Sequence, residues 1–140
     1  MQYTNAQFRS ILCGLGYLGK EFVSDGNSSS FPVTSDNSSL TGTHTRYAIT
    51  QFQQEYKIQA DGLVGPQTMG KAEQVMKILQ NELNQCAKTG LPNNQPFYGP
   101  LTTAAVKKFQ AKIGVKQDGI ARSSLRLKLY ELYRTGACSV

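Results

Sequence analysis

The sequence predicts an all-α protein in which two tandem three-helix units share a long central helix. Apolar residues recur at spacings of three and four over most of the chain, the pattern of amphipathic helices. A helix–corner–helix segment at residues 48–68 recurs 57 positions later. Between the two copies, one apolar stripe continues without a break, which indicates a single helix that belongs to both units.

The first helix is expected over residues 3–15, with Thr4 or Asn5 as its N-cap. Its apolar face is spaced three to four residues apart and comprises Phe8, Ile11, Leu12 and Leu15. Gly14 and Gly16 end it. Residues 17–23 show no period and predict an extended segment or a short turn.

The composition changes over residues 24–43, where Ser, Thr, Asn, Asp and Gly take 16 of 20 places. A loop of this length inside a compact domain is either functional or a tolerated insertion. The first alternative predicts a flap beside a binding groove, and the second a surface excursion. Both alternatives stay open.

Thr43 or Thr45 is expected to cap the second helix, which runs to about Lys57. A third helix opens at Pro66, since proline is favoured in the first turn. The third helix is expected to end near Thr89–Gly90. Its apolar stripe has spacings of 3, 4, 3, 4 and 3 and comprises Met69, Ala72, Met76, Leu79, Leu83 and Cys86.

The internal repeat aligns residues 42–64 with residues 99–121 and gives seven identities in 23 places without a gap. The identical pairs include Ala48/Ala105, Phe52/Phe109, Gln53/Gln110, Asp61/Asp118 and Gly62/Gly119. A closing helix at about 123–134 completes the second copy. We therefore expect one unit at residues 1–76 and a second, degenerate unit at residues 77–140.

The charge distribution and the cysteines limit the function classes. Of the net charge of +6, all lies in residues 72–140, which carry ten basic and four acidic side chains. Such a field favours anionic partners, although a solvated lysine-rich surface explains it equally well. Three scattered cysteines and one histidine give no zinc spacing, so no metal or cofactor is expected. Buried thiols are the default for Cys13 and Cys86, and a Cys86–Cys138 disulfide is the alternative hypothesis.

The corner of the first copy resembles a known family. Ala48-Ile49, Phe52-Gln53, Asp61-Gly62-Leu63-Val64-Gly65-Pro66 and Thr68 match nearly the whole motif of the three-helix peptidoglycan-binding domain, a module appended to bacterial cell-wall hydrolases. The second copy matches through Asp118-Gly119-Ile120 and then departs, with Arg122-Ser123-Ser124-Leu125 where the family has Gly-Pro-x-Thr. The resemblance implies a non-catalytic module that binds peptidoglycan, through its glycan or its stem peptide, in the periplasm or outside the cell.

Most of the repeated residues predict architecture rather than binding. Phe52 and Phe109 lie on apolar stripes and are expected in the core. Asp61 and Asp118 are expected to accept backbone N–H bonds at a helix start. The remaining structural motif residues are Gly62, Gly65, Pro66 and Gly119.

Aromatic and amide side chains beside the corners are the candidate ligand contacts, because sugars present apolar faces and hydroxyl groups. They are Tyr47, Gln53 and Gln67 in the first copy, and Tyr98, Thr102 and Gln110 in the second. For Gln53 and Gln110 an equal alternative is a hydrogen bond to the neighbouring loop backbone.

Three further expectations follow. Catalysis is not expected, because the chain has one histidine and no recognisable nucleophile–base pair. No apolar run approaches the roughly 18 residues of a membrane span. The first residues lack the features of a secretory signal, so an envelope location implies that a signal was removed.

The alternative functions are a protein-interaction scaffold on the same fold and, with weaker support, an electrostatic nucleic-acid binder.

Overall fold

The computed structural model describes residues 1–138. Within these residues five α-helices follow one another, with a short 3-10 helix, η1 (Lys20–Phe22), after the first. They are α1 (Asn5–Gly14), α2 (Thr43–Glu55), α3 (Pro66–Cys86), α4 (Pro100–Ile113) and α5 (Ser123–Arg134). The described residues form no strand, so the all-α prediction is confirmed.

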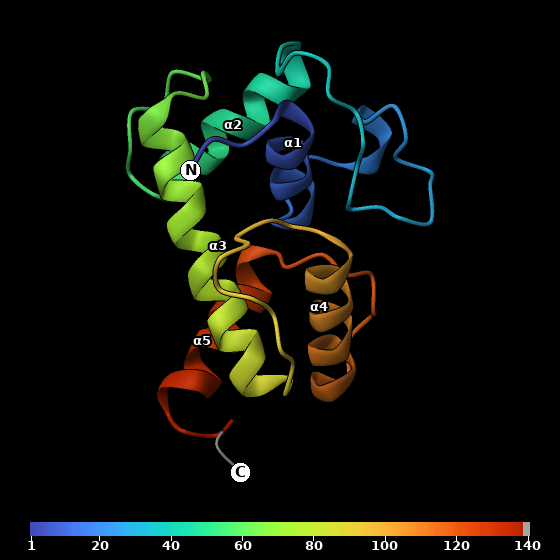
Figure 1. Cartoon of the computed structure of the whole chain (residues 1–140), viewed down its shortest axis with the longest axis vertical. Helices are drawn as coiled ribbons and strands as arrows, with labels where there is room; N and C mark the ends of the chain where they lie inside the picture. The colour runs from blue at the N-terminus through green and yellow to red at the C-terminus, as the bar shows by residue number, and fades with distance from the viewer. Residues whose placement is uncertain (139–140) are drawn as a thin grey trace.

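The central helix α3 is a single helix of 21 residues. It runs along the length of the molecule, with α1 and α2 beside its beginning and α4 and α5 beside its end (Figure 1). The N-terminal amino group reaches back to it and forms an ion pair with Glu73 at 2.7 Å. The residues of the uninterrupted apolar stripe thus lie on one continuous helix.

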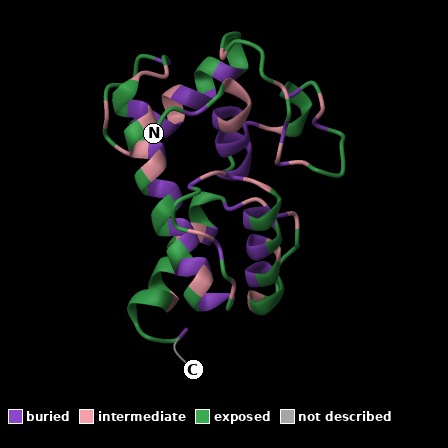
Figure 2. Ribbon diagram, in the orientation of Figure 1, coloured by how far each residue is buried: buried purple, intermediate pink, exposed green. Residues whose placement is uncertain are grey.

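Helix α1 forms the centre of the upper half of the molecule. Every residue from Phe8 to Gly14 is buried, so the ribbon of α1 has the colour of buried residues after its first turn in Figure 2. Thr4 caps it in a reciprocal arrangement with Gln7, in which each side chain accepts a hydrogen bond from the other residue's backbone N–H.

Two predicted helix ends differ from the structure. The N-cap of α2 is Gly42, with φ of +91°, rather than Thr43 or Thr45. Helix α3 ends at Cys86, short of Thr89–Gly90, because Lys88 adopts a left-handed φ of 55°. A left-handed residue stops an α-helix, and it is a rare conformation for lysine that sequence patterns do not reveal.

The end of α3 is also the site of a covalent link. Cys86 and Cys138 form a disulfide across 52 positions of sequence. This confirms the disulfide hypothesis and corrects the default expectation of a free thiol at Cys86. Cys13 is a free, buried thiol, and burial raises its pKa to about 12.

The two units meet at a close contact between Gly14 and Tyr98. A Cβ added to Gly14 would lie 2.4 Å from the Tyr98 ring, so only glycine leaves room for it. At the same place the Ala121 N–H donates to the Gly14 carbonyl at 2.7 Å. The Arg126 guanidinium, which is half-buried, donates to Leu15 O and to Ala121 O. These contacts hold the units together in addition to α3.

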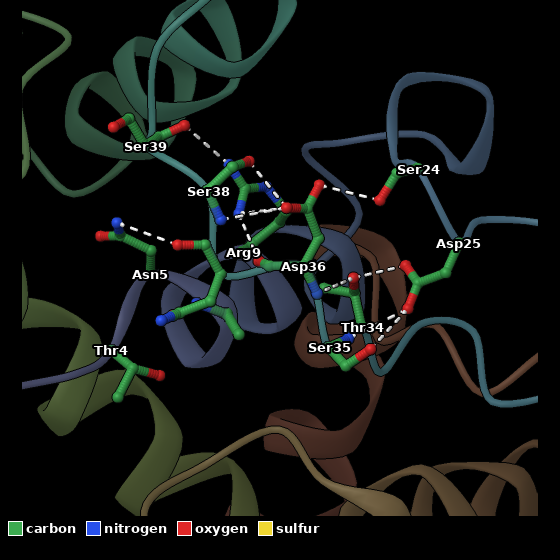
Figure 3. Close-up of polar contacts among 12 residues, drawn as sticks. Thr4, Asn5, Arg9, Ser24, Asp25, Thr34, Ser35, Asp36, Ser38 and Ser39 are labelled. Carbon is green, nitrogen blue, oxygen red and sulfur yellow. Dashed lines mark hydrogen bonds and ion pairs between the residues drawn. The ribbon is translucent and has the colours of Figure 1, made fainter.

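The polar segment 24–43 is bound to α1 rather than free of it (Figure 3). Arg9 of α1 is buried and donates to the backbone carbonyls of Asp36 and Ser39. Asp36 in turn accepts hydrogen bonds from Ser24 and from Ser38. Local Ser, Asp and Thr bonds of this kind satisfy a backbone that has no regular structure. The segment is an ordered lobe at the side of the first unit.

Candidate functional site

The first corner is built around the side chain of Gln53. It is completely buried and its Nε2 donates to Leu63 O at 2.9 Å, to Thr68 Oγ1 at 3.0 Å and to Asp61 Oδ1 at 3.1 Å. Its Oε1 accepts the Gly62 N–H at 2.9 Å. One amide therefore joins α2, the turn and the first turn of α3.

Asp61 completes this corner from the turn itself. Its carboxylate accepts the N–H of Leu63 at 3.0 Å, which lowers the pKa of Asp61. The acceptor role matches the prediction, but the partner lies within the turn and not at the helix start, because α3 begins only at Pro66. Gly62 has φ of +71°, which explains why glycine follows the aspartate.

The second corner repeats this geometry. Gln110 Oε1 accepts the Gly119 N–H, and its Nε2 donates to Asp118 and to Ile120 O. Burial would raise the pKa of Asp118, but hydrogen bonds from Arg122 and Gln110 outweigh it and lower the pKa. One contact is missing from the second corner, because Leu125 stands where Thr68 stands in the first.

The structure therefore places Gln53 and Gln110 inside the corners. Both are buried and their amides serve the turn backbone, which is the loop-bonding alternative of the sequence analysis. Phe52 and Phe109, as predicted, lie fully in the core.

Two further candidate contacts of the second copy also lie in the interior. The Tyr98 ring is buried against Gly14, and its hydroxyl donates to Gly119 O at 2.6 Å. The Thr102 hydroxyl is buried between Gln80 and the Phe97 carbonyl. The sequence did not reveal this, because their burial depends on the other unit and on α3. None of the candidate contacts of the second copy faces solvent.

The candidate contacts that remain on the surface belong to the first copy. Tyr47 is 64% exposed, and Gln67 at the start of α3 is exposed. One turn before Tyr47 on α2, His44 stacks on Phe22 of η1 with ring centroids 3.8 Å apart and an interplanar angle of 17°. Residues three apart on a helix share a face. We call Phe22, His44 and Tyr47 the aromatic patch.

A second surface feature lies against the second corner. Two adjoining hollows of about 410 and 450 Å³ share Lys116, Asp118, Ile120 and Arg122 in their walls. The first extends toward η1 and includes Lys20, whereas the second extends along α5 to Ser124 and Lys128. We call the second hollow the corner trough.

The corner trough combines a positive rim with an apolar floor. Its floor is formed by aliphatic side chains, namely Ile113, Val115, Ile120 and Leu125. Arg122 forms an ion pair with Asp118 at 2.9 Å, but neither Lys116 nor Lys128 forms an ion pair with a described residue. The N-terminus of α5 also lies here, and no side chain among residues 1–138 caps it.

Sequence reasoning missed Phe22, His44 and the cations of the corner trough. Only the fold brings Phe22 next to His44, since 21 intervening residues separate them. The trough did leave a signal in the sequence. Positions 116 and 122 hold lysine and arginine where the first copy has Gln59 and Gly65, so comparison of the copies by charge, and not by identity alone, would have indicated it.

Comparison with models of known protein families identifies the family of this chain. The model described as "Putative peptidoglycan binding domain" matches the chain twice in tandem, at residues 14–71 and 73–124. The chain belongs to this family. No curated protein and no solved structure matches it.

The two peptidoglycan-binding domain copies meet within α3, because the matches end at residue 71 and resume at residue 73. Each match contains one glutamine-centred corner. This confirms the tandem repeat and the predicted family. The family indicates general peptidoglycan binding and a cell-wall or envelope location.

The described residues of these peptidoglycan-binding domains were also searched for membrane-spanning helices and for groups of metal-binding side chains. None of its helices combines the length and apolar character needed to cross a bilayer. Within residues 1–138, no group of three or more His, Cys, Asp or Glu side chains is placed to hold a metal ion.

Proposed function

We propose that this protein is a non-catalytic module that holds itself, or an associated cell-wall hydrolase, on peptidoglycan. The observation that carries the proposal is the family match in both units, each with its buried glutamine corner. We take residues 1–76 and 77–140 as the two units. Their architecture is devoted to a rigid frame, since the repeated Phe, Gln, Asp and Gly residues are all structural.

The aromatic patch is the proposed contact for the glycan strand. Sugar rings present apolar C–H faces that pack on aromatic rings, and an exposed aromatic side chain has hydrophobic surface to bury. Tyr47 is largely exposed and Phe22 is 44% exposed, so both rings present apolar surface that a bound sugar can cover. Gln67 remains a proposed hydrogen-bonding partner for the N-acetyl groups of the same strand.

The disulfide supports an envelope or extracellular location. Disulfides persist in oxidising compartments such as the periplasm and the exterior of the cell. The Cys86–Cys138 link therefore fits a periplasmic or secreted protein. The non-catalytic character is proposed on the chemistry of the surface features, since the aromatic patch and the corner trough contain no nucleophile beside a general base.

Co-sedimentation with purified peptidoglycan sacculi tests the proposal. We expect the wild-type protein to sediment with sacculi at both low and high salt. Phe22→Ala and Tyr47→Ala are expected to reduce the bound fraction severalfold, because each removes an apolar contact of about 1–2 kcal/mol. Tyr130→Ala, which removes a tyrosine that is 49% exposed on α5, is the control and is expected to bind normally.

The outcomes separate the alternatives. Absence of sedimentation at either salt would contradict the proposal. Sedimentation that disappears at high salt, together with salt-sensitive binding to DNA or RNA, would instead support the electrostatic nucleic-acid binder.

One observation favours a second candidate, a protein-interaction module. An apolar hollow of about 200 Å³ lies between α3 and α5, and its walls include Ile78 and Tyr130, both about half exposed. Exposed aromatic anchors are typical of protein interfaces. If Tyr130→Ala abolished retention of a protein partner while sacculi failed to bind any variant, this function would replace wall binding.

A further inference from the structure

The geometry points to a second, chemically distinct binding site in the corner trough, for a short acidic peptide with small aliphatic side chains. This inference rests on the proposed function and refines it. The first copy contacts the glycan, and the second copy contacts the peptide part of peptidoglycan. Three independent features of the trough lead to it.

The first feature is a change of charge between the copies. At the positions that form the rim, the second copy has Lys116, Arg122 and Lys128, whereas the first has Gln59, Gly65 and Lys71. Each copy has one aspartate at the corner. The trough thus has three cations and one carboxylate, against one cation and one carboxylate at the equivalent surface. Opposite charges attract over the distances of such a rim, so the trough selects an anion.

The second feature is the exposed start of α5. The first N–H groups of a helix have no intrahelical partner and attract anions. Arg122 occupies the N-cap position and provides no side-chain cap, and the N1 position is Ser123. The corresponding N1 residue of α3 is Pro66, which has no N–H. The second copy therefore directs one more backbone donor toward its trough.

The third feature is the apolar floor, which selects between anionic wall components. Val115 is 48% exposed, and Ile113, Ile120 and Leu125 line the hollow beside it. The carbons of a polyol phosphate chain all bear oxygen, so such a chain buries little apolar surface on this floor, whereas alanine buries a whole methyl group. A volume of about 450 Å³ accommodates a short peptide segment. The chemistry of the floor and rim together is that of an alanine-containing peptide with free carboxylates.

Each part of the peptide has a place in this arrangement. A carboxylate at the start of α5 accepts hydrogen bonds from the free N–H groups and lies between Arg122 and Lys128. A second carboxylate reaches Lys116, which forms no ion pair within the described chain. The methyl groups lie on Val115 and Leu125. Arg122 keeps its ion pair with Asp118, so its contribution is weaker than that of the two lysines.

The test uses a synthetic tetrapeptide of alanine, γ-linked glutamate, lysine and C-terminal alanine in which both amino groups are acetylated, so that its two carboxylates are its only charges, and the same peptide with both carboxyl groups amidated. Binding to the full chain is measured by calorimetry and by backbone amide NMR. We expect the acidic peptide to bind about tenfold more tightly than the amidated one, with shifts at residues 115–125. The double variant Lys116→Gln/Lys128→Gln is expected to weaken binding by about tenfold or more.

The chain contains its own matched control. Lys71 is the first-copy equivalent of Lys128, so Lys71→Gln makes the same charge change as Lys128→Gln alone but outside the trough, and it is expected to leave peptide binding unchanged. Equal binding of the amidated peptide, or unchanged binding by the double variant, would overturn the inference. Tighter binding of poly(glycerol phosphate) than of the peptide would also overturn it and would identify a phosphate polymer as the ligand.

The inference and the proposed function fail separately. If sacculi sediment with the protein and depend on Phe22 and Tyr47 while the tetrapeptide does not bind, the trough inference is wrong and the wall-binding function stands. If the tetrapeptide binds with the expected charge dependence while sacculi do not, the trough is confirmed and the glycan contact is wrong.

Discussion

At the residue scale, one buried glutamine in each copy determines the shape of the corner. A side-chain amide has donors and an acceptor on one planar group, so a single residue can bond backbone N–H and C=O groups of one turn together. Gln53 does so for Gly62 and Leu63, and it also reaches Thr68 on the next helix. Leucine at the last of these positions in the second copy leaves Gln110 with one partner fewer.

We predict that Gln53→Met destabilises the protein by about 2 to 4 kcal/mol, because the variant keeps the volume but leaves the buried Gly62 N–H and Thr68 hydroxyl without their partner. Gln110→Met is expected to cost less, since fewer partners are lost. The measurement is the free energy of unfolding in urea. Gln54→Met, at the exposed neighbouring position of α2, is the control and is expected to change it little. A loss below about 0.5 kcal/mol for Gln53→Met would contradict the structural role.

The residues that sequence analysis placed correctly are those whose environment is decided locally. Phe52 and Phe109 follow from helical periodicity, and the αL glycines follow from the turn. Tyr98 could not be placed, because its burial depends on Gly14, which lies 84 positions earlier. Gln53 stayed ambiguous because a polar residue at the edge of an apolar stripe can be a buried hydrogen-bonding group or an exposed one, and only the path of the corner distinguishes them.

At the scale of elements, α3 has to pack against both units with one face. Its stripe from Ala72 to Cys86 is buried, as the spacing predicts. The unexpected member is Glu82, which is 6% exposed and lines the apolar hollow between α3 and α5. Burial raises the pKa of Glu82 to about 7. A carboxylic acid that is harder to ionise in the folded state makes stability depend on pH.

We predict that Glu82→Gln stabilises the protein at pH 8 but has little effect at pH 5. The pKa of Glu82 is raised on folding, so the wild-type loses stability as pH rises from about 4.5 to about 7 and stays at the lower level above that. The gain at pH 8 is expected to be about 1 to 3 kcal/mol. Thermal unfolding across this pH range measures it. Glu131→Gln removes a carboxylate from the exposed side of α5 and is the control. Parallel pH profiles for wild type and Glu82→Gln would contradict the prediction.

At the scale of the molecule, three connections make the two units one body. The first is α3 itself, and the second is the contact of Gly14 with Tyr98. The third is Arg126, which bonds the end of α1 and forms an ion pair with Glu55 of α2 at 2.9 Å. A rigid pair holds the aromatic patch and the corner trough at a fixed separation. Two sites on one body bind a polymer more tightly than either alone, because the second contact becomes intramolecular.

The Cys86–Cys138 disulfide closes the second unit into a ring, and its loss tests how far that unit depends on it. Cross-linking positions 52 residues apart restricts the unfolded chain, which gives an expected loss of about 2 to 4 kcal/mol on reduction. Two hydrogen bonds flank the disulfide, because Lys88 donates to the Cys138 carbonyl and Lys112 of α4 donates to the Cys86 carbonyl at the end of α3. We therefore expect reduction to lower the melting temperature and to weaken binding in the corner trough more than sacculus binding through the aromatic patch.

Thermal unfolding of the wild-type protein with and without reductant measures the effect of reduction. A Cys86→Ser/Cys138→Ser variant, whose stability is expected not to change with reductant, is the control. If reduction weakened both binding activities equally, the two units would unfold together and the disulfide would stabilise the whole molecule rather than its second half.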